Sequence, residues 1–312
     1  MTKLREDDQK NWTDETLGKA RTVIEEKLKA EGLSQYAFLS PGPELESEEV
    51  RSILVVLFPY LADDYQPDAN LSLYCRGKDY HAVAPRYLSR VAEEAKKVLG
   101  SEFTYHPYAD TGPLRDRHLA LSAGLGFIGR SQMLINRTYG SYFFIAYMLM
   151  NAPFQSEKVL PEAPKDGFPV KCMECGRCIE ACPGGVIHRD GTYNWEKCRS
   201  LITQKKGELS EEEKEILAKD SLIFGCDICQ TVCPYNQRAK TSPIPEFTKD
   251  RIDRLNLSDL EGLSRKQFLE KYPDRAFTWR GPEVLRRNLR LLEKPQLIRG
   301  EESDGDREKI SG

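Results

Sequence analysis

The sequence predicts a mixed α/β (α+β) domain that is followed by a cysteine-rich, metal-binding region and a short helical segment. Helical and strand-like patterns alternate over the first half of the chain, and eight of the nine cysteines lie between Cys172 and Cys233. With 312 residues, 39% of them hydrophobic, the chain can bury a proper core. Its net charge of −3 shows no general basic excess, so any nucleic-acid site must be a local patch.

The first elements follow from the spacing of apolar residues. Leucine, alanine and isoleucine recur at helical spacing over residues 17–28, which predicts an amphipathic helix that ends near Gly32. Residues 52–60, SILVVLFPY, are apolar and rich in β-branched side chains, and they predict a buried strand. Residues 88–99 repeat the helical pattern and are closed by Gly100.

The later elements continue the alternation. Residues 103–108 predict a strand, residues 109–135 pass from a turn through a helix to a glycine-rich loop, and residues 141–150 predict the next strand. Residues 242–245 read as a proline-marked linker, and the polar tail is expected to be disordered. We therefore expect an α/β domain at 1–165, a cysteine-rich domain at 166–240, a helical segment at 241–300 and a disordered tail at 301–312.

The location of the protein bears on its cysteines. The amino terminus is polar, and no stretch reaches the ~20 apolar residues that cross a bilayer. We therefore expect a cytoplasmic protein, whose thiols stay reduced. Clustered cysteines in that setting indicate metal ligation.

The cysteines form one complete motif and one incomplete copy. Residues 172–185, CMECGRCIEACPGG, contain C-x2-C-x2-C-x3-C-P, which is typical of bacterial two-cluster ferredoxins. In that motif three thiolates hold one 4Fe–4S cluster and the fourth holds the other. Residues 226–236, CDICQTVCPYN, lack one cysteine, and Cys198 is the candidate nearby. We call this exchange of the last cysteine between the two clusters the crossing rule. It predicts one cluster on Cys172, Cys175, Cys178 and Cys233, and a second on Cys182, Cys198, Cys226 and Cys229.

A pair of zinc sites is the alternative interpretation, because four thiolates in short C-x2-C pairs also bind zinc. Zinc requires neither four cysteines in one such run nor a proline after both runs. The pattern therefore favours two iron–sulfur clusters, which conduct single electrons but do not identify a reaction.

Other parts of the sequence resemble a known family. CRGKDYH at 75–81, DTGPLRDRHLALSAGLGFIGR at 110–130, GSYFF at 140–144 and TWRG at 278–281 occur in this order around the two cysteine runs. The ordered set resembles epoxyqueuosine reductase across almost the whole chain.

The resemblance implies an oxidoreductase that depends on cobalamin and two 4Fe–4S clusters. It would reduce epoxyqueuosine to queuosine at the wobble position of tRNA, the last step of queuosine biosynthesis, with Co(I) attacking or reducing the epoxide carbon. The cobalamin domain would be similar in fold to flavin nitroreductases. Many members continue into a helical-repeat extension, so this chain is expected to be a short form that lacks it. Family members often have Lys-Asn where this chain has Arg130 and Ser131, and a small residue where it has Cys75.

The resemblance also assigns the site. Asp110 matches the catalytic aspartate of the family, and we expect it to protonate the epoxide oxygen with a pKa raised by an apolar pocket. From the residues alone, a turn-forming aspartate is the simpler interpretation. The cobalamin contacts are assigned to Arg76, Lys78, Asp79, Tyr80, His81, Gly129, Arg130 and Ser131, with solvated turns and loop packing as the alternatives.

A local basic and aromatic group near the carboxy end is a candidate tRNA contact. Such side chains bind phosphates and stack on bases. The group comprises Trp279, Arg280, Arg286, Arg287 and Arg290. A solvated helix face is the alternative.

Two other functions stay open at this stage. A cobalamin-dependent reductase of a small molecule, similar to reductive dehalogenases, would need no tRNA surface, and an electron-transfer protein of the ferredoxin type would need no corrin. For epoxyqueuosine reduction, the function that the resemblance implies, we expect tRNA carrying epoxyqueuosine and an unidentified low-potential electron donor as partners, no membrane contact, and a monomer.

Overall fold

A computed structural model describes residues 12–43, 45–64, 66–162 and 169–293. Its centre is a four-stranded sheet in the order β1-β2-β6-β3, in which every neighbouring pair is antiparallel. The strands are β1 (Tyr36–Leu39), β2 (Ser52–Pro59), β3 (Tyr105–Ala109) and β6 (Phe143–Met150), and a separate pair is formed by β4 (Phe127–Ile128) and β5 (Leu134–Ile135).

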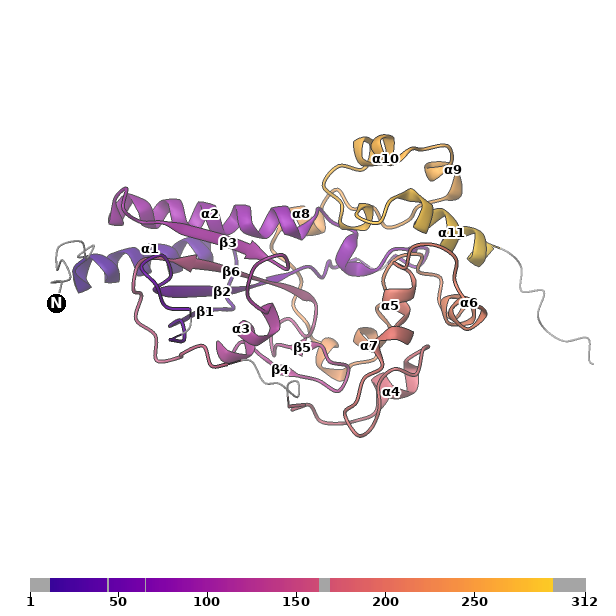
Figure 1. The fold of residues 1–312 in the computed structure, drawn as a ribbon, viewed down its shortest axis with the longest axis horizontal. Coiled ribbons are helices and arrows are strands. Elements are labelled where there is room, and N and C mark those ends of the chain that lie inside the picture. Colours follow the sequence, from indigo (N-terminus) through magenta and orange to yellow (C-terminus); the bar gives the residue numbers. More distant parts are fainter. Residues whose placement is uncertain (1–11, 44, 65, 163–168, 294–312) are drawn as a thin grey trace, which may run out of the picture.

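Helices cover both faces of the sheet (Figure 1). On one face, Leu54, Val56 and Phe58 of β2 pack in one core with α1 (Asp14–Ala30) and α2 (Tyr80–Leu99). The intervening residues of β2 pack on the other face with α3 (Asp116–Ser122). Because both faces of β2 are buried, its continuous apolar sequence is explained, and the predicted strand at 52–60 is confirmed.

The start of α2 differs from the prediction. The sequence pattern predicted this helix only over residues 88–99, whereas the helix already begins at Tyr80, with Asp79 as its N-cap. The Asp79 carboxylate accepts the backbone N–H of His81 at 3.0 Å, which satisfies one of the unpaired donors of the first turn. The predicted end at Gly100 is confirmed, with a φ of 83°.

The rest of the chain is built from short helices and 3₁₀ turns. In the cysteine-rich part these are α4 (Arg177–Ala181), η2 (Trp195–Lys197), α5 (Arg199–Ile202), α6 (Glu211–Ala218), α7 (Ile228–Thr231) and η3 (Pro234–Asn236). The carboxy-terminal part contains α8 (Pro245–Thr248), α9 (Leu257–Leu260), α10 (Arg265–Lys271), η4 (Ala276–Thr278) and α11 (Pro282–Glu293), and η1 (Leu73–Cys75) precedes α2.

The segment predicted as a linker is packed into the domain. Ile244 and Phe247 are buried in the same core as α1 and α2, and Glu246 accepts the backbone N–H of Lys78 at 2.8 Å. A Cβ on Gly77 would come within 2.8 Å of the Phe247 Cα, so α8 lies directly against this turn. The expected domain bounds stay a prediction, and the expected disordered tail, 301–312, lies outside the described residues.

A buried polar network joins the sheet to the cysteine-rich part. The Asn236 side chain accepts the backbone N–H of Ser141 at 2.7 Å and donates to the Gln230 carbonyl at 2.7 Å. The Tyr60 hydroxyl donates to the Gln230 side chain at 3.2 Å. A Cβ on Gly140, whose φ is 58°, would collide with Asn236, so glycine is required there. The network fixes the second cysteine run, residues 226–236, to the end of the sheet where β2 stops and β6 starts.

Of the helices in the described ranges, none combines the length and the apolar character that crossing a bilayer would require.

Candidate functional site

The eight cysteines of the two runs form two sets in space. One hollow is lined by Cys172, Cys175, Cys178 and Cys233, and another by Cys182, Cys198, Cys226 and Cys229. These are the two sets that the crossing rule predicts. We call them the first set and the second set.

Electrostatic effects within each set agree with this grouping. Burial, then Cys172, Cys175 and Cys233, raise the pKa of the Cys178 thiol. Among the described residues, no three His, Cys, Asp or Glu side chains are arranged to hold a single metal ion. A cluster with an iron at each ligand needs more widely spaced thiols than one ion does.

The glycine-rich loop after α3 supports the first set. The backbone N–H of Arg130 donates to the Cys172 sulfur at 3.4 Å, and the Arg130 side chain forms an ion pair with Glu174. Gly129 and Arg130 line only the hollow of the first set, whereas Ser131 lines both hollows. Of these three residues, which the resemblance assigned to cobalamin, only Ser131 faces the space beyond the second set.

The second set forms one wall of a cavity of about 380 Å³. The rest of its lining is mainly apolar and aromatic: Tyr60, Tyr74, Tyr80, Met133, Phe143, Phe144, Val186, Ile187 and Tyr193. Tyr80, Phe143 and Phe144 also line a neighbouring hollow of about 600 Å³ that contains Asp110, Arg115, Asp116 and Arg117. An aromatic space therefore leads from the second set to Asp110. Such a lining suits a flat macrocycle, which fits the cobalamin implied by the sequence.

Asp110 lies at the centre of a hydrogen-bond network. Tyr80 donates its hydroxyl to Asp110 Oδ2 at 3.0 Å, and His81 Nε2 lies 3.2 Å from the same oxygen. His81 Nδ1 lies 2.7 Å from Asp79 Oδ1. The Tyr80 ring stacks on Phe144, with centroids 4.0 Å apart and the planes within 6°. The first turn of α2 therefore brings three of the predicted residues, Asp79, Tyr80 and His81, to Asp110.

The pKa values in this network correct one expectation. Hydrogen bonds that the His81 ring donates to Asp110 and Asp79 raise the pKa of His81 to about 9. The His81 hydrogen bond lowers the pKa of Asp110 and outweighs the effect of burial. The expected rise in the Asp110 pKa is therefore wrong, because two donors stabilise its carboxylate. At neutral pH the proton is on His81, and Asp110 is ionised.

Asp116 is a site residue that the sequence reasoning missed. Its Oδ2 accepts the backbone N–H of Asp110 at 2.9 Å, and its buried Oδ1 has no hydrogen-bond partner among the described residues. Burial raises the pKa of Asp116 to about 6. Asp110 has a φ of 62°, an uncommon conformation for a residue other than glycine, and Asp116 braces it there. The only signal in the sequence was a second aspartate at the start of the next helix.

Two predicted cobalamin contacts, Arg76 and Lys78, lie outside the aromatic space. Arg76 is buried, donates to the Leu71 carbonyl at 2.7 Å and lies 3.6 Å from Asp253. Lys78 forms an ion pair with Asp250 at 3.0 Å. Neither lines the two hollows described above, and both tie α2 to the carboxy-terminal part.

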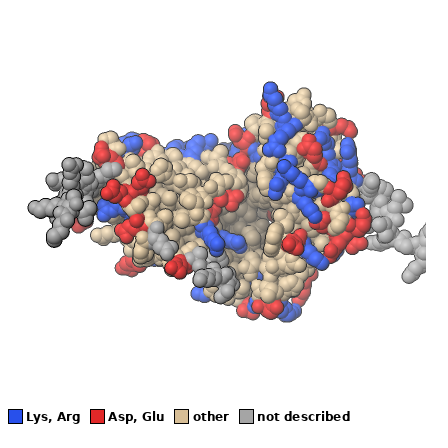
Figure 2. Space-filling view, in the orientation of Figure 1, with Lys and Arg blue, Asp and Glu red and all other residues tan. Residues whose placement is uncertain are grey.

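The predicted basic and aromatic group divides into two kinds of side chain. Arg286 and Arg287 donate to backbone carbonyls, including those of Leu260 and Lys205, so they brace α11. Trp279 is 50% exposed, with the Arg280 guanidinium 3.5 Å from the centre of its ring, and Arg290 is exposed. Figure 2 shows Lys and Arg side chains gathered over this carboxy-terminal part, beside the hollowed middle of the molecule.

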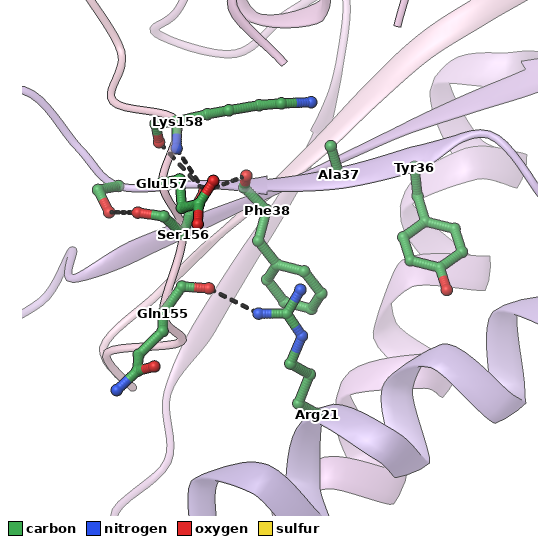
Figure 3. A pocket seen from close by; sticks show the side chains of 9 residues that line it. Arg21, Tyr36, Ala37, Phe38, Gln155, Ser156, Glu157 and Lys158 are labelled. Carbon is green, nitrogen blue, oxygen red and sulfur yellow. Dashed lines mark hydrogen bonds between the residues drawn. The ribbon is translucent and has the colours of Figure 1, made fainter. Parts of the chain in front are cut away.

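A larger hollow of about 820 Å³ lies at β1, away from the cysteines (Figure 3). Its two cations are already used within the protein. Arg21 donates to the Gln155 carbonyl at 2.6 Å, and Lys158 donates to the Ala123 carbonyl at 2.6 Å. We assign no function to this hollow.

Comparison with protein families gives two matches. Residues 42–111 match the family described as "Epoxyqueuosine reductase QueG, DUF1730", and residues 171–236 match the "4Fe-4S double cluster binding domain".

Curated relatives carry the same name. An epoxyqueuosine reductase of Lactococcus garvieae is 34% identical over 256 residues, which cover 79% of this chain and 70% of the relative. One of Bacillus subtilis is 33% identical over 260 residues, which cover 80% of this chain and 64% of the relative. The chain thus spans about two thirds of the length of these relatives.

Solved structures are similar in fold and sequence. Epoxyqueuosine reductase of Streptococcus thermophilus has a TM-score of 0.69 and 27% identity, covering 87% of this chain and 80% of that one. An epoxyqueuosine reductase bound to an epoxyqueuosine-modified tRNA stem loop has a TM-score of 0.71 and 26% identity, covering 88% and 81%. A Bacillus subtilis structure with its catalytic aspartate loop swung out of the active site has a TM-score of 0.70 and 26% identity, covering 88% and 81%.

Proposed function

Because this chain belongs to the epoxyqueuosine reductase family, we propose that it reduces epoxyqueuosine to queuosine at the wobble position of tRNA. The observation that carries this proposal is the aromatic space that leads from the second cysteine set to Asp110. With clusters bound, the second set would deliver electrons at one end of this space, and Asp110 would deliver protons at the other.

The reaction defines what each end must deliver. Removing the oxygen of an epoxide to leave an alkene consumes two electrons and two protons and releases water. We propose that the electrons reach the cavity through 4Fe–4S clusters held by the first and then the second set. Cobalamin, when bound, supplies the low-potential chemistry that breaks the carbon–oxygen bonds. Ser131, Tyr60, Phe143 and Phe144 would contact it.

We assign the proton path to His81 and Asp110. The His81 imidazolium lies within hydrogen-bond distance of Asp110, so it can protonate this carboxylate as the oxygen of the substrate approaches. A bound substrate also excludes water from Asp110, which favours its neutral form. Asp110 then passes the proton to the epoxide oxygen, and the Tyr80 hydroxyl keeps the carboxyl aimed at the cavity.

The tRNA would lie across the hollowed face. Residues 251–293 contain ten Lys and Arg against seven Asp and Glu, although the whole chain has a net charge of −3. We propose that Trp279, Arg280 and Arg290 contact the anticodon stem-loop, since Trp279 and Arg290 are exposed and the Arg280 guanidinium lies over the Trp279 ring. The cytoplasmic location and the monomeric state stay predictions.

The experiment compares substrates. Protein with both clusters and cobalamin, under anaerobic reduction, is given tRNA that carries epoxyqueuosine, the free epoxyqueuosine nucleoside, or a halogenated phenol. We expect conversion of the tRNA, with a much lower kcat/KM for the nucleoside and no dehalogenation. Conversion of the phenol without conversion of the tRNA would instead establish a small-molecule reductase.

A further inference from the structure

One corner of the first cysteine set lies at the protein surface. Cys175 is exposed, and the adjacent Met173 is 58% exposed, which is unusual for a large apolar side chain. Lys171 and Arg177 on either side are also exposed. We call these four residues the entry surface. We propose that the entry surface docks a small acidic protein that carries one electron at a time, such as a flavodoxin or a ferredoxin.

The position of the first set supports this assignment. The second set lines the cavity that holds Tyr80, whereas the first set lines a separate hollow next to Arg130. The two sets adjoin, since α4, which carries Cys178 of the first set, packs against α7, which carries Cys229 of the second. Electrons that enter at Cys175 therefore have a direct route inward. This step depends on the proposed function only in requiring that the clusters be reduced from outside.

The charges on the entry surface favour an acidic partner. The two acids between residues 169 and 180 each have a cation beside them, because Glu174 pairs with Arg130 and Glu180 lies 3.9 Å from Arg189. In the described part of the chain, Lys171 and Arg177 form no ion pair. An exposed methionine between two unpaired cations therefore suits an acidic partner with an apolar centre. Electron-transfer encounters use small interfaces, so a patch of this size is sufficient.

Each docking event transfers one electron. The carrier is oxidised by one electron and the first cluster is reduced by one, without bond formation between the proteins. Two such events supply the two electrons for one epoxide, and the two protons arrive separately through His81 and Asp110.

The test measures cluster reduction without tRNA or cobalamin. Reduced flavodoxin is mixed anaerobically with protein that carries both clusters, and the bleaching of cluster absorbance is followed at several salt concentrations. In the double variant Lys171→Glu/Arg177→Glu, we expect the second-order rate constant at low salt to fall at least about tenfold and its salt dependence to weaken. Reduction by dithionite, which needs no docking, should be unchanged. Lys19→Glu on α1 is the matched control, and it should behave like the wild type.

The binding of flavodoxin provides a second readout. Its affinity, measured by NMR titration of labelled flavodoxin, should fall in the double variant. If that variant binds less iron, Lys171→Gln/Arg177→Gln replaces it, with a smaller loss expected. Unchanged rates and affinity would overturn the proposal. So would a loss of affinity for tRNA in place of flavodoxin, because the surface would then bind nucleic acid. Since no epoxide is involved, this test can fail while tRNA reduction is observed, or succeed while it is not.

Discussion

His81 should keep its proton well above neutral pH, and Asp110→Asn should lower its pKa. Hydrogen bonds that the His81 ring donates to Asp110 and Asp79 raise the pKa of His81 from 6.5 to about 9, with the bond to Asp110 the larger cause. At about 1.4 kcal/mol per pH unit, the full shift corresponds to about 3 kcal/mol. The His81 side chain is 34% exposed and that of Asp110 is 62% exposed, so solvent screening reduces this to about 1–2 kcal/mol. Because Asp79 remains in the variant, we expect the pKa of His81 to fall by about one unit.

NMR titration of histidine-labelled protein measures this directly, because the chain has only four histidines. We expect one resonance with a midpoint near 9 in the wild type and a lower midpoint in Asp110→Asn. Asp63→Asn removes an exposed carboxylate elsewhere and serves as the control. A wild-type His81 that titrates near 6.5, or a midpoint that Asp110→Asn leaves unchanged, would refute the proposed network.

The same shifts set the sign of the pH dependence of stability. Because the pKa of His81 is higher in the folded protein, its contribution to the free energy of unfolding is fully present below pH 6.5 and is lost as the pH rises through about 9. The pKa values of Asp110 and Asp79 are lowered, so their contribution is present above the ordinary aspartate pKa and is lost as the pH falls below it.

Three further variants test other parts of the site. Cys198→Ala should leave one cluster, so iron analysis should find about half of the wild-type iron, and full iron content would remove Cys198 from the ligands. Asp116→Ala should speed amide hydrogen exchange at Asp110 and lower kcat about tenfold, because the N–H of the strained residue loses its acceptor. Asp116→Asn should behave like the wild type, and equal losses in both variants would argue against this bracing role. Arg287→Ala should lower the free energy of unfolding by about 2 kcal/mol in urea denaturation, since its guanidinium donates to three backbone carbonyls, whereas exposed Arg290→Ala should change it by less than about 0.5 kcal/mol. Similar values for the two arginines would contradict the difference in their contacts.

The sequence predicted the elements that depend on local pattern. The helix at 17–28 and the buried strand at 52–60 followed from periodicity, and the role proposed for Cys198 followed from counting ligands. The sheet order β1-β2-β6-β3 could not be predicted in this way, because it depends on pairing between distant segments. The lowered pKa of Asp110 was missed for the same reason, since its donors lie about 30 residues earlier in the chain.

Tertiary contacts also explain why two predictions from the local sequence were incomplete. Proline at 243 and 245 indicated a linker, but Ile244 and Phe247 complete the core beneath α2. The run of arginines in α11 indicated one basic face, but Arg287 is directed at the backbone carbonyls of Lys205 and Gly207, 82 and 80 residues earlier in the chain. In both cases the residue types were identified correctly from the sequence, and the tertiary packing decided which of them face solvent.

We propose that Asp110 and the two clusters act together on an epoxide in tRNA. The most direct measurement is mass spectrometry of nucleosides from epoxyqueuosine-containing tRNA after anaerobic turnover by the wild type and by Asp110→Asn, with equal iron and cobalamin content. We predict that the wild type removes one oxygen atom from the nucleoside and that Asp110→Asn leaves nearly all of it unchanged. Equal conversion by both proteins would contradict the role of Asp110, and no conversion by a fully loaded wild type would contradict the proposed function.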